Sequence, residues 1–341
     1  MDILREFSRK ATLAYARARQ PRNYVGATLF PVQTVNELTF EYWKSLNLLP
    51  VMASVQAFGA EAEIASRDGA EKVTGEIPTI KRKIPLNGRA LVALRREGAG
   101  DVDFVRNTLY NDLDNMIDAV HARIEQMRID AIATGKIELD ENGVVMTVDY
   151  GVPANHKEVL SGTDKWSDHA NAKPIEAIQD WVSTIVADTG VTPARALTSN
   201  TVVTHLLKSA EIRKLIYGDA GGSRAISLNQ LNELMRQMNL PAIATYDLQV
   251  RRQLRNGTYQ TARFLPEAKF VLLPGEKLGD TLMGPTEDAM LDPDIEAREM
   301  AGIYAAVYTQ TMDPPVIETK AAASAIPTFP MADTVFIADV I

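Results

Sequence analysis

Residues 103–134, which read DFVRNTLYNDLDNMIDAVHARIEQMRIDAIAT, carry the clearest structural signal in the chain. Apolar side chains recur there in steps of three and four, a spacing that places them in one stripe along a helix. The stripe consists of Val105, Leu109, Leu113, Met116, Val120, Ile124, Met127 and Ala131. Asp101 or Asp103 can cap the start of this helix, and Gly135 favours its end. At about 1.5 Å per residue the helix spans roughly 45 Å, the length of a strut rather than of an average globular helix.

The other side of this helix is charged. Its charged residues are Arg106, Asp112, Asp114, Asp118, Arg123, Glu125 and Arg128. A charge run opposite an apolar stripe is the usual solvated side of an amphipathic helix. We therefore expect these side chains to face water rather than to form a binding patch.

Beyond the helix the pattern predicts a hairpin and then an α/β unit. Residues 136–139 and 144–150 alternate apolar and polar side chains around the turn sequence DENG, which predicts a β-hairpin. Pro174 opens the next unit, since proline suits the first turn of a helix. The expected helices are 174–188, 201–216 and 227–238, and the expected strands are 194–199, 241–247, 259–264 and 268–273. The stretch 293–341 returns to β character, and its expected strands are 303–311, 316–322 and 334–340.

Upstream of the long helix, the sequence shows no core of its own. The β-prone stretches 32–40 and 48–55 are broken by glycine and proline, so no compact domain closes there. Residues 62–92 read as short strands, and in 76–84 the apolar side chains are too sparse to fill a core. Two strands this polar would be marginal alone. We therefore expect another molecule to cover them.

A basic arm opens the chain. Residues 1–25 hold Arg5, Arg9, Lys10, Arg17, Arg19 and Arg22 against only Asp2 and Glu6. Their apolar residues Ile3, Leu4, Phe7, Ala11 and Ala14 have roughly helical spacing. Two interpretations remain open: a solvated helix face, and an arm that lies across a neighbouring acidic subunit.

Bulk properties exclude several classes of protein. The chain has 341 residues, 46% of them apolar, with a formal net charge of −8 and a pI near 5.2. This acidic balance argues against a surface that holds nucleic acid by neutralising phosphates. The sequence has no cysteine, which removes disulfides, thiolate metal sites and thiol nucleophiles. No run of about 18 uncharged apolar residues exists, so we expect neither a membrane span nor export from the cytoplasm.

The sequence predicts no catalytic, cofactor-binding or metal-binding residue. The four histidines match no metal-ligand spacing and are interpreted as surface or capped residues; they are His121, His156, His169 and His205. Three carboxylates at Asp292, Asp294 and Glu296 could hold a divalent cation, but a turn with a helix cap explains them more simply. The glycine-rich residues 218–224 lack the ending of a phosphate loop and are interpreted as a mobile loop.

Several short stretches stand in a specific order along nearly the whole chain. They are Phe30-Pro31, 65–69 with Pro78 and 81–83, 131–136, 148–151, Trp166, 264–266, 271–274, Tyr304 and 312–315. In that order and spacing the sequence resembles the major capsid protein E family of lambda-type phages.

The resemblance implies an α+β chain with the HK97-like capsid fold. The implied parts are an N-terminal arm at 1–54, an extended E-loop at 55–95, a peripheral (P) domain at 96–172 with its spine helix at about 103–134 and a hairpin, an axial (A) domain at 173–292, and returning P-domain strands at 293–341. The pattern of the residues alone agrees with this division.

The same resemblance implies a structural protein and not an enzyme. It implies a major capsid protein of a tailed bacteriophage, whose copies form the pentamers and hexamers of an icosahedral shell around double-stranded DNA. The implied partners are further copies of the chain and portal, scaffolding and head-decoration proteins, with neither sequence-specific DNA binding nor a membrane. The implied location is the virion, after assembly in the host cytoplasm. No cofactor is implied.

Candidate contacts between subunits are basic residues of the arm and the E-loop. They are Arg67, Lys81, Arg82, Lys83, Arg9 and Arg17. The E-loop residues could pair with acidic residues of adjacent subunits, although a solvated charge run explains them equally well.

Two other functions remain as alternatives. An encapsulin-like nanocompartment of a cell shares the fold without packaging a genome. A metal-dependent hydrolase would use Asp292, Asp294 and Glu296.

Overall fold

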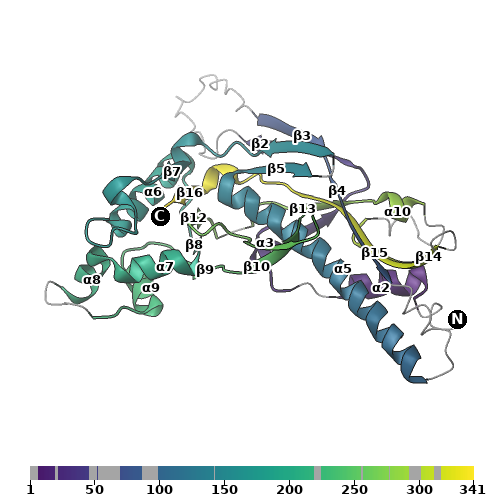
Figure 1. The fold of residues 1–341 in the computed structure, drawn as a ribbon. Coiled ribbons are helices and arrows are strands. Elements are labelled where there is room, and N and C mark those ends of the chain that lie inside the picture. Colours follow the sequence, from purple (N-terminus) through teal and green to yellow (C-terminus); the bar gives the residue numbers. More distant parts are fainter. Residues whose placement is uncertain are drawn as a thin grey trace, which may run out of the picture. The chain divides into compact units, whose positions relative to one another are not determined.

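The computed structural model describes residues 7–19, 22–45, 52, 70–86, 99–141, 143–218, 224–254, 256–275, 277–291, 301–310 and 316–341 (Figure 1). The chain divides into two compact units and passes between them several times. The first unit comprises Met1–Phe40, Thr74–Arg128 and Asp280–Thr328, and the second comprises Glu41–Val73, Ile129–Gly279 and Phe329–Ile341. Each unit is built around a five-stranded sheet.

The predicted long helix is confirmed as α5, which runs over Ala99–Thr134 and contains 36 residues. It begins about one turn before the predicted start, so Asp101 and Asp103 lie inside the helix rather than at its cap. It ends as predicted, because Gly135 adopts a left-handed φ of 77° and its N–H donates to the Ala131 carbonyl at 2.9 Å. The side chain of Val105 lies outside the described residues, and the rest of the predicted apolar stripe is buried.

The charged side of α5 is only partly solvated, which corrects the prediction. Glu125 is fully buried, and its carboxylate accepts a hydrogen bond from the Gly26 N–H at 2.9 Å. A Cβ at Gly26 would lie 2.5 Å from Glu125 Oε2, so this close approach requires glycine. Arg128 is also buried; its guanidinium lies 3.6 Å from Glu125 Oε2, and its Nε donates to Thr281 Oγ1 at 2.8 Å. The helical pattern cannot show these partners because they lie about 100 and 150 residues away in sequence.

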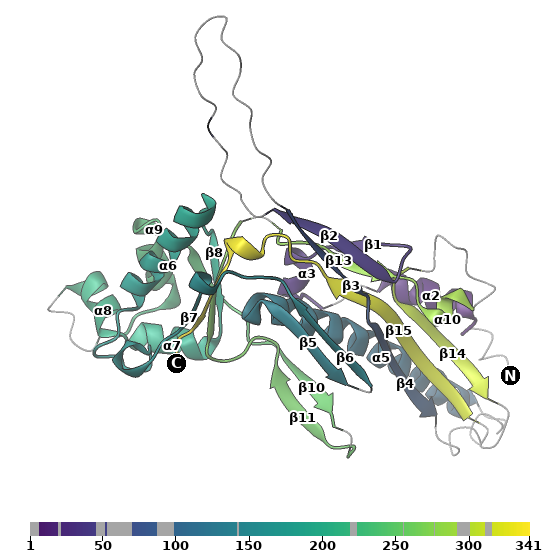
Figure 2. The ribbon, with the colours of Figure 1, turned by 90° about the horizontal axis from the view of Figure 1, so that it is seen from above.

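The sheet of the first unit combines strands from three stretches of the chain. Its path runs β1 (Val32–Thr34), β13 (Thr281–Gly284), β15 (Val316–Pro327) and β14 (Tyr304–Gln310), with β4 (Thr79–Leu86) paired to β15 as well. β1 is parallel to β13, and the other pairs are antiparallel. Figure 2 shows β15 lying between β4 and β14. As the central strand, β15 has no exposed residue.

The polar strands upstream of α5 do not pair with each other. β3 (Ala70–Glu76) pairs with β2 (Thr39–Ser45), whereas β4 runs antiparallel to β15 from Leu86↔Ile317 to Thr79↔Ser324. The expectation that another molecule must cover these strands is therefore wrong for β4, because the chain's own β15 supplies its hydrogen-bond ladder. The predicted strand at 48–55, apart from residue 52, lies outside the described residues.

The basic arm also packs on its own chain. α2 (Arg9–Ala18) lies against the edge strand β14, where Thr12 Oγ1 donates to the Ala305 carbonyl at 2.9 Å. Arg19, directly after the helix, pairs with Asp118 of α5 at 3.1 Å. A helix that covers an edge strand blocks strand addition there. The arm is therefore not a wholly solvated face, and its contact with a neighbouring subunit stays a prediction. The short helix α3 (Val25–Leu29) follows.

The second unit contains the predicted α/β arrangement. Its sheet has the order β7 (Lys157–Val159), β16 (Phe336–Asp339), β12 (Lys269–Leu273), β8 (Arg195–Thr198) and β9 (Ala242–Thr245). Its helices are α6 (Pro174–Thr189), α7 (Asn200–Lys208), α8 (Ala210–Tyr217) and α9 (Leu228–Gln237). The expected helix at 201–216 is two helices that meet at Ser209, whose extended ψ of 136° interrupts the helical path.

An aromatic cluster forms the core of the second unit. Trp181 of α6 is stacked on Phe336 with ring centroids 5.1 Å apart, and its ring lies 5.9 Å from that of Phe270. Trp166 packs edge-on against Phe270 at 5.0 Å. Residues of all four helices join the same apolar cluster. The sequence therefore builds this unit in the ordinary way, with helices packed on a sheet through large apolar side chains.

Two two-stranded ribbons lie wholly within the second unit. β5 (Lys136–Glu141) and β6 (Val144–Asp149) form the predicted hairpin. β10 (Gln249–Gln253), which the sequence did not predict, pairs with the predicted strand β11 (Tyr259–Arg263).

The predicted returning segment 293–341 supplies strands to both sheets, because β14 and β15 join the first and β16 joins the second. The short helices are η1 (Ala154–His156), η2 (Gly162–Asp164), α10 (Glu287–Met290) and η5 (Ala332–Thr334). In the described part of the chain no helix is long and apolar enough to cross a membrane.

Candidate subunit interface

Two of the predicted contact residues lie on one face of β4 and already have partners in the chain. Lys81 and Lys83 share that face because strand side chains alternate. Lys81 forms an ion pair with Glu287 of α10, and Lys83 Nζ lies 2.9 Å from Glu318 Oε1 of β15. The side chain of Lys83 is 60% exposed, whereas that of Glu318 is only 10% exposed, so the carboxylate end of this pair is buried.

Further charged residues extend this face across the sheet. Lys320 stands directly opposite Lys83 in the β4–β15 ladder and pairs with Asp288 at 2.6 Å. Tyr308 of β14 donates to Glu318 at 2.6 Å, and this bond, followed by that from Lys83, lowers the pKa of the Glu318 carboxyl. We call this set the polar face; it consists of Lys81, Lys83, Lys320, Glu287, Asp288 and Glu318. Its three cations and three anions balance, so it presents no net charge to a partner.

The remaining predicted contact residues are spread over the first unit and beyond it. Arg82 points to the opposite side of β4 and is half-buried. Arg17 is exposed on α2, and Arg9 begins the same helix, although its side chain lies outside the described residues. α2 and α10 meet in a small apolar cluster through Leu13 and Ala289. The structure thus brings α2 close to the acidic end of the polar face, while Arg67 lies outside the described residues.

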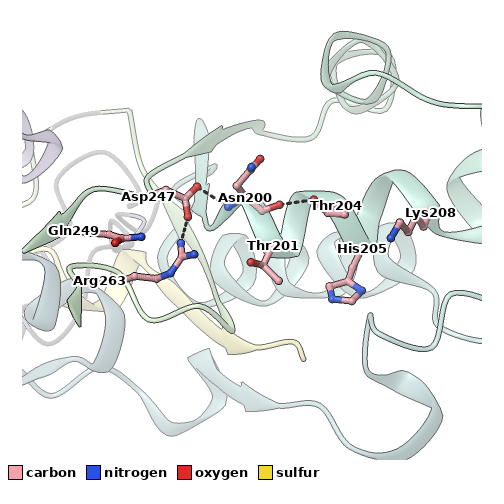
Figure 3. Close-up of a pocket in the computed structure, with 8 residues that line it drawn as sticks. All are labelled: Asn200, Thr201, Thr204, His205, Lys208, Asp247, Gln249 and Arg263. Carbon is pink, nitrogen blue, oxygen red and sulfur yellow. Dashed lines mark hydrogen bonds and ion pairs between the residues drawn. The ribbon is translucent and has the colours of Figure 1, made fainter. Parts of the chain in front are cut away.

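A polar groove of about 430 Å³ lies in the second unit, between α7 and the base of the β10–β11 ribbon (Figure 3). It is lined by Asn200, Thr201, Thr204, His205, Lys208, Asp247, Gln249 and Arg263. Asp247 organises one end, since it accepts a hydrogen bond from the Asn200 N–H at 2.7 Å and pairs with Arg263. The Thr204 hydroxyl donates to the Asn200 carbonyl at 2.9 Å.

The chemistry of this groove is that of a contact surface. His205 Nδ1 lies 2.9 Å from His169 Nε2, and burial, followed by the charge of His169, lowers the pKa of His205. The Thr201 hydroxyl is bonded to Glu267, and that of Thr204 to a main-chain carbonyl, so neither hydroxyl is paired with a histidine that could act as its base. The groove therefore offers hydrogen-bonding groups and positive charge rather than an activated nucleophile.

The predicted metal and loop candidates lie mostly outside the residues that the structure describes. Within the described ranges no group of three or more histidine, aspartate or glutamate side chains could hold a metal ion. Asp292, Asp294 and Glu296 lie outside those ranges, as do residues 219–223 of the predicted mobile loop. His156 corrects one interpretation, because it is fully buried rather than at the surface, with Nε2 3.1 Å from Asp188 Oδ2.

Comparison with known protein families explains this combination of parts. The family model of phage major capsid protein E matches residues 12–340. The chain belongs to this capsid protein family. The comparison with curated proteins gives no match.

Solved structures share the fold of this capsid protein E chain. A proposed capsid protein from a prophage of E. coli CFT073 has a TM-score of 0.62 at 15% identity, with 97% of both chains covered. A phage-related protein of Bordetella bronchiseptica RB50 has a TM-score of 0.52 at 15% identity, covering 97% of this chain and 96% of the other. The capsid asymmetric unit of cyanophage A-1(L) has a TM-score of 0.52 at 11% identity, with 95% of both chains covered.

The family and the fold together decide the main predictions. The α+β, HK97-like capsid fold is confirmed. The chain is a phage major capsid protein, a structural component of the virion, and not an enzyme. The family therefore does not favour the encapsulin-like alternative and excludes the hydrolase. The sequence did not indicate that Glu125 and Arg128 are buried, and the strands β10 and β13 were not predicted from it.

Proposed function

We propose that copies of this chain assemble head-to-tail into pentamers and hexamers, and that these rings close into an icosahedral shell around double-stranded DNA. The observation that carries the proposal is the capsid family match over residues 12–340, nearly the whole chain. Rings require heterologous contacts, in which one surface of a subunit meets a different surface of the next. A subunit of two units with unlike surfaces suits such contacts.

We assign the parts of the chain to the roles that the HK97-like fold implies. The N-terminal arm is 1–54, the E-loop 55–95, the P domain 96–172 with returning strands in 293–341, and the A domain 173–292. In support of the P domain, α5 as far as Arg128 and the β14–β15 pair lie in one compact unit. In support of the A domain, helices α6 to α9 share one core.

The contacts proposed between subunits use Arg67, Lys81, Arg82, Lys83, Arg9 and Arg17. The pair of Lys81 with Glu287 supports this, because Glu287 is 70% exposed and pairs at the surface are worth only about 0–1 kcal/mol and can exchange partners at little cost. In the shell Lys81 would turn from Glu287 toward a carboxylate of an adjacent subunit.

The further partners proposed are portal, scaffolding and head-decoration proteins, with assembly in the host cytoplasm. DNA would be enclosed without sequence-specific binding. The net charge of −8 supports this, since a negative wall does not grip a phosphate polymer as it fills the shell.

The test is size-exclusion chromatography with negative-stain microscopy of the purified full chain, alone and co-expressed with the genes beside it. Closed shells or five- and six-membered rings are expected. A chain that stays monomeric or dimeric at every concentration and in every co-expression would overturn the proposal. A thermal unfolding curve of the same samples, monitored by circular dichroism, shows whether such a monomer is folded.

A further inference from the structure

Lys44 is a buried lysine of the second unit, near the end of β2. Its side chain is only 5% exposed, and its ammonium has three oxygen partners. Nζ lies 2.7 Å from Asp333 Oδ1, and it donates to the Gly151 carbonyl at 2.7 Å and to the Tyr150 carbonyl at 3.3 Å. A lysine ammonium carries three N–H donors. Lys44 can therefore use all of them at one defined point of the unit.

The backbone that binds Lys44 is itself held in place. Tyr150 is almost fully buried, its ring lies 5.7 Å from that of Phe329, and its N–H donates to the Gly135 carbonyl at 3.0 Å. Gly151 has a left-handed φ of 65°, and a Cβ there would lie 3.2 Å from Lys44 Nζ. Glycine at this position therefore admits the ammonium without crowding. The site that receives Lys44 is built from backbone with a fixed conformation.

A charge at this position contributes more to orientation than to stability. Burying an ammonium costs free energy that an ion pair only partly returns, and an apolar side chain of similar volume often stabilises a fold as well or better. Hydrogen bonds are directional, so the ammonium must meet all three oxygens at once. An apolar side chain has no such requirement. Lys44 is therefore better suited to fixing the position of β2 than to raising the free energy of unfolding.

The position of β2 also determines that of β3. The two strands form a two-stranded sheet and lie side by side in Figure 2. An ion pair between Lys72 and Glu41 links them at 2.5 Å, but both side chains are exposed, so it adds little. Two strands alone are at best marginally stable in water, and this pair therefore needs an attachment such as Lys44. Since β3 lies in the proposed E-loop range 55–95, the attachment also locates the E-loop.

We propose that Lys44 is the positioning residue of the E-loop: its buried ammonium fixes the β2–β3 pair on the second unit, so that the E-loop meets the adjacent subunit in one orientation. The inference rests on the proposed shell assembly and on the proposed E-loop range. Association loses less entropy when a contact element already has its bound orientation. A subunit whose β2–β3 pair is detached should therefore stay folded and assemble poorly.

The first test is the Lys44→Met variant of the full chain, which keeps most of the bulk of the side chain and removes its three bonds. In the unassembled subunit, hydrogen exchange measured by mass spectrometry should rise at least about tenfold in β2 and β3, because bonds to a charged group are lost. Exchange in β12, in the core of the same unit, should change much less. The yield of closed shells, counted by negative-stain microscopy, should fall at least about tenfold.

A second variant separates position from stability. Lys44→Met leaves the Asp333 carboxylate, which is 21% exposed, without the Lys44 cation, so the unfolding temperature should fall. Adding Asp333→Asn removes that charge, and the thermal unfolding curve should return toward that of the unmodified chain. Exchange in β3 and the shell yield should not return, because the Tyr150 and Gly151 carbonyls still lack their donor. Recovery of shells together with stability would overturn the positioning role.

The Lys269→Met variant is the matched control. Lys269 is another lysine of the second unit that is mostly buried, at 16% exposed, and its Nζ lies 2.8 Å from Asp339 Oδ2 in the β12–β16 ladder. Its loss should also lower the unfolding temperature, but exchange in β3 and the shell yield should stay unchanged. An equal fall in shell yield would overturn the proposal, because destabilisation alone would then explain the loss of assembly.

The same measurements distinguish failure of this inference from failure of the proposed function. Normal shells from the Lys44→Met variant would overturn the positioning role, whatever its exchange, and would leave the proposed function intact. If the unmodified chain formed neither shells nor rings, the proposed function would fail and the positioning role with it, even where exchange shows that Lys44 holds β2 and β3.

Discussion

The two five-stranded sheets are stabilised by different kinds of side chain. The sheet of the second unit is covered by helices through Trp166, Trp181, Phe270 and Phe336, all nearly or fully buried. The sheet of the first unit has an alanine-rich central strand, with the buried ion pair Glu125–Arg128 on the helix beside β13. The second unit packs its sheet with aromatic rings, whereas the first unit packs an alanine-rich strand and the large apolar side chains of α5 and also holds a charged pair inside.

The connectivity of the two units explains this difference. Helices and strands of the second unit come mostly from one stretch, Ile129–Gly279. The first unit instead joins residues such as Lys83 and Glu318, which are 235 positions apart. Directional hydrogen bonds and ion pairs specify such long-range register more sharply than apolar contacts do. The second unit can therefore fold on local information, whereas the first needs specific partners to find its pairing.

The largest effect should come from opening the aromatic core of the second unit. Trp181→Ala leaves a cavity and removes three ring contacts, so we expect the free energy of unfolding of that unit to fall by about 5 kcal/mol. Hydrogen exchange measured by mass spectrometry should show faster exchange in β12 than in the unmodified chain. Exchange in β15 should change much less.

The conservative variant sharpens this result. Trp181→Phe keeps an aromatic ring in the site, so it should retain more than half of the lost stability. Equal acceleration of exchange in β12 and β15 in the Trp181→Ala variant would contradict the comparison, because the two sheets would then unfold as one body.

The second effect is expected at the buried pair of the first unit. Arg128→Met keeps the bulk of the side chain but removes the charge beside the fully buried Glu125 carboxylate. We expect a loss of about 3 kcal/mol in the unfolding free energy of the first unit, because a buried charge is left uncompensated. Exchange should then rise in β13 and β15 and stay unchanged in β12.

A second substitution separates charge from packing. In the chain with Glu125→Gln and Arg128→Met, the glutamine carbonyl can still accept from the Gly26 N–H, and no charge remains buried. This variant should recover to within about 1 kcal/mol of the unmodified chain. If both variants were equally unstable, shape rather than charge would explain the role of Arg128.

Features that depend on local sequence patterns could be predicted, and those that depend on partners remote in sequence could not. The stripe of α5, its end at Gly135 and the hairpin β5–β6 follow from periodicity and turn residues, and the structure confirms them. The α/β unit was predictable because its helices carry local apolar patterns, apart from the break at Ser209.

The first unit and the candidate contacts were less predictable. No local pattern indicates that β4 pairs with β15 or that Glu125 and Arg128 turn inward, because their partners are remote in sequence. In β10, three polar or charged residues follow Val250, so the strand lacks the apolar–polar alternation by which strands are recognised in a sequence. It lacks this pattern because almost none of its residues is buried. A charge run such as Lys81 to Lys83 indicates that ion pairs form but does not identify the carboxylates that take part. The contacts of these residues between subunits therefore stay predictions.

The smallest expected effect is a pH dependence of the free energy of unfolding. One histidine in each unit contributes to it, so it still distinguishes the two units. Burial lowers the pKa of His121 on α5 from 6.5 to about 4, with smaller opposing and supporting effects from Asp118, Arg128 and Arg19. The unfolded chain therefore takes up a proton near pH 6.5 while the folded unit stays unprotonated until about pH 4. Stability due to this group is complete above pH 6.5 and is lost as the pH falls toward 4, by about 1–2 kcal/mol.

In the His121→Gln variant, hydrogen exchange in β15 should depend less on pH than in the unmodified chain. The pH dependence of exchange in β12 should stay unchanged. His205, whose pKa is also lowered by burial, is the matched control in the second unit, because His205→Gln should flatten only the pH dependence of β12. An unchanged slope for β15 in the His121→Gln variant would show that this histidine is not held neutral in the folded chain. If either variant altered both sheets, the two units would share one unfolding equilibrium. The unit specified by local sequence and the unit fixed by remote charged partners would then not be energetically independent.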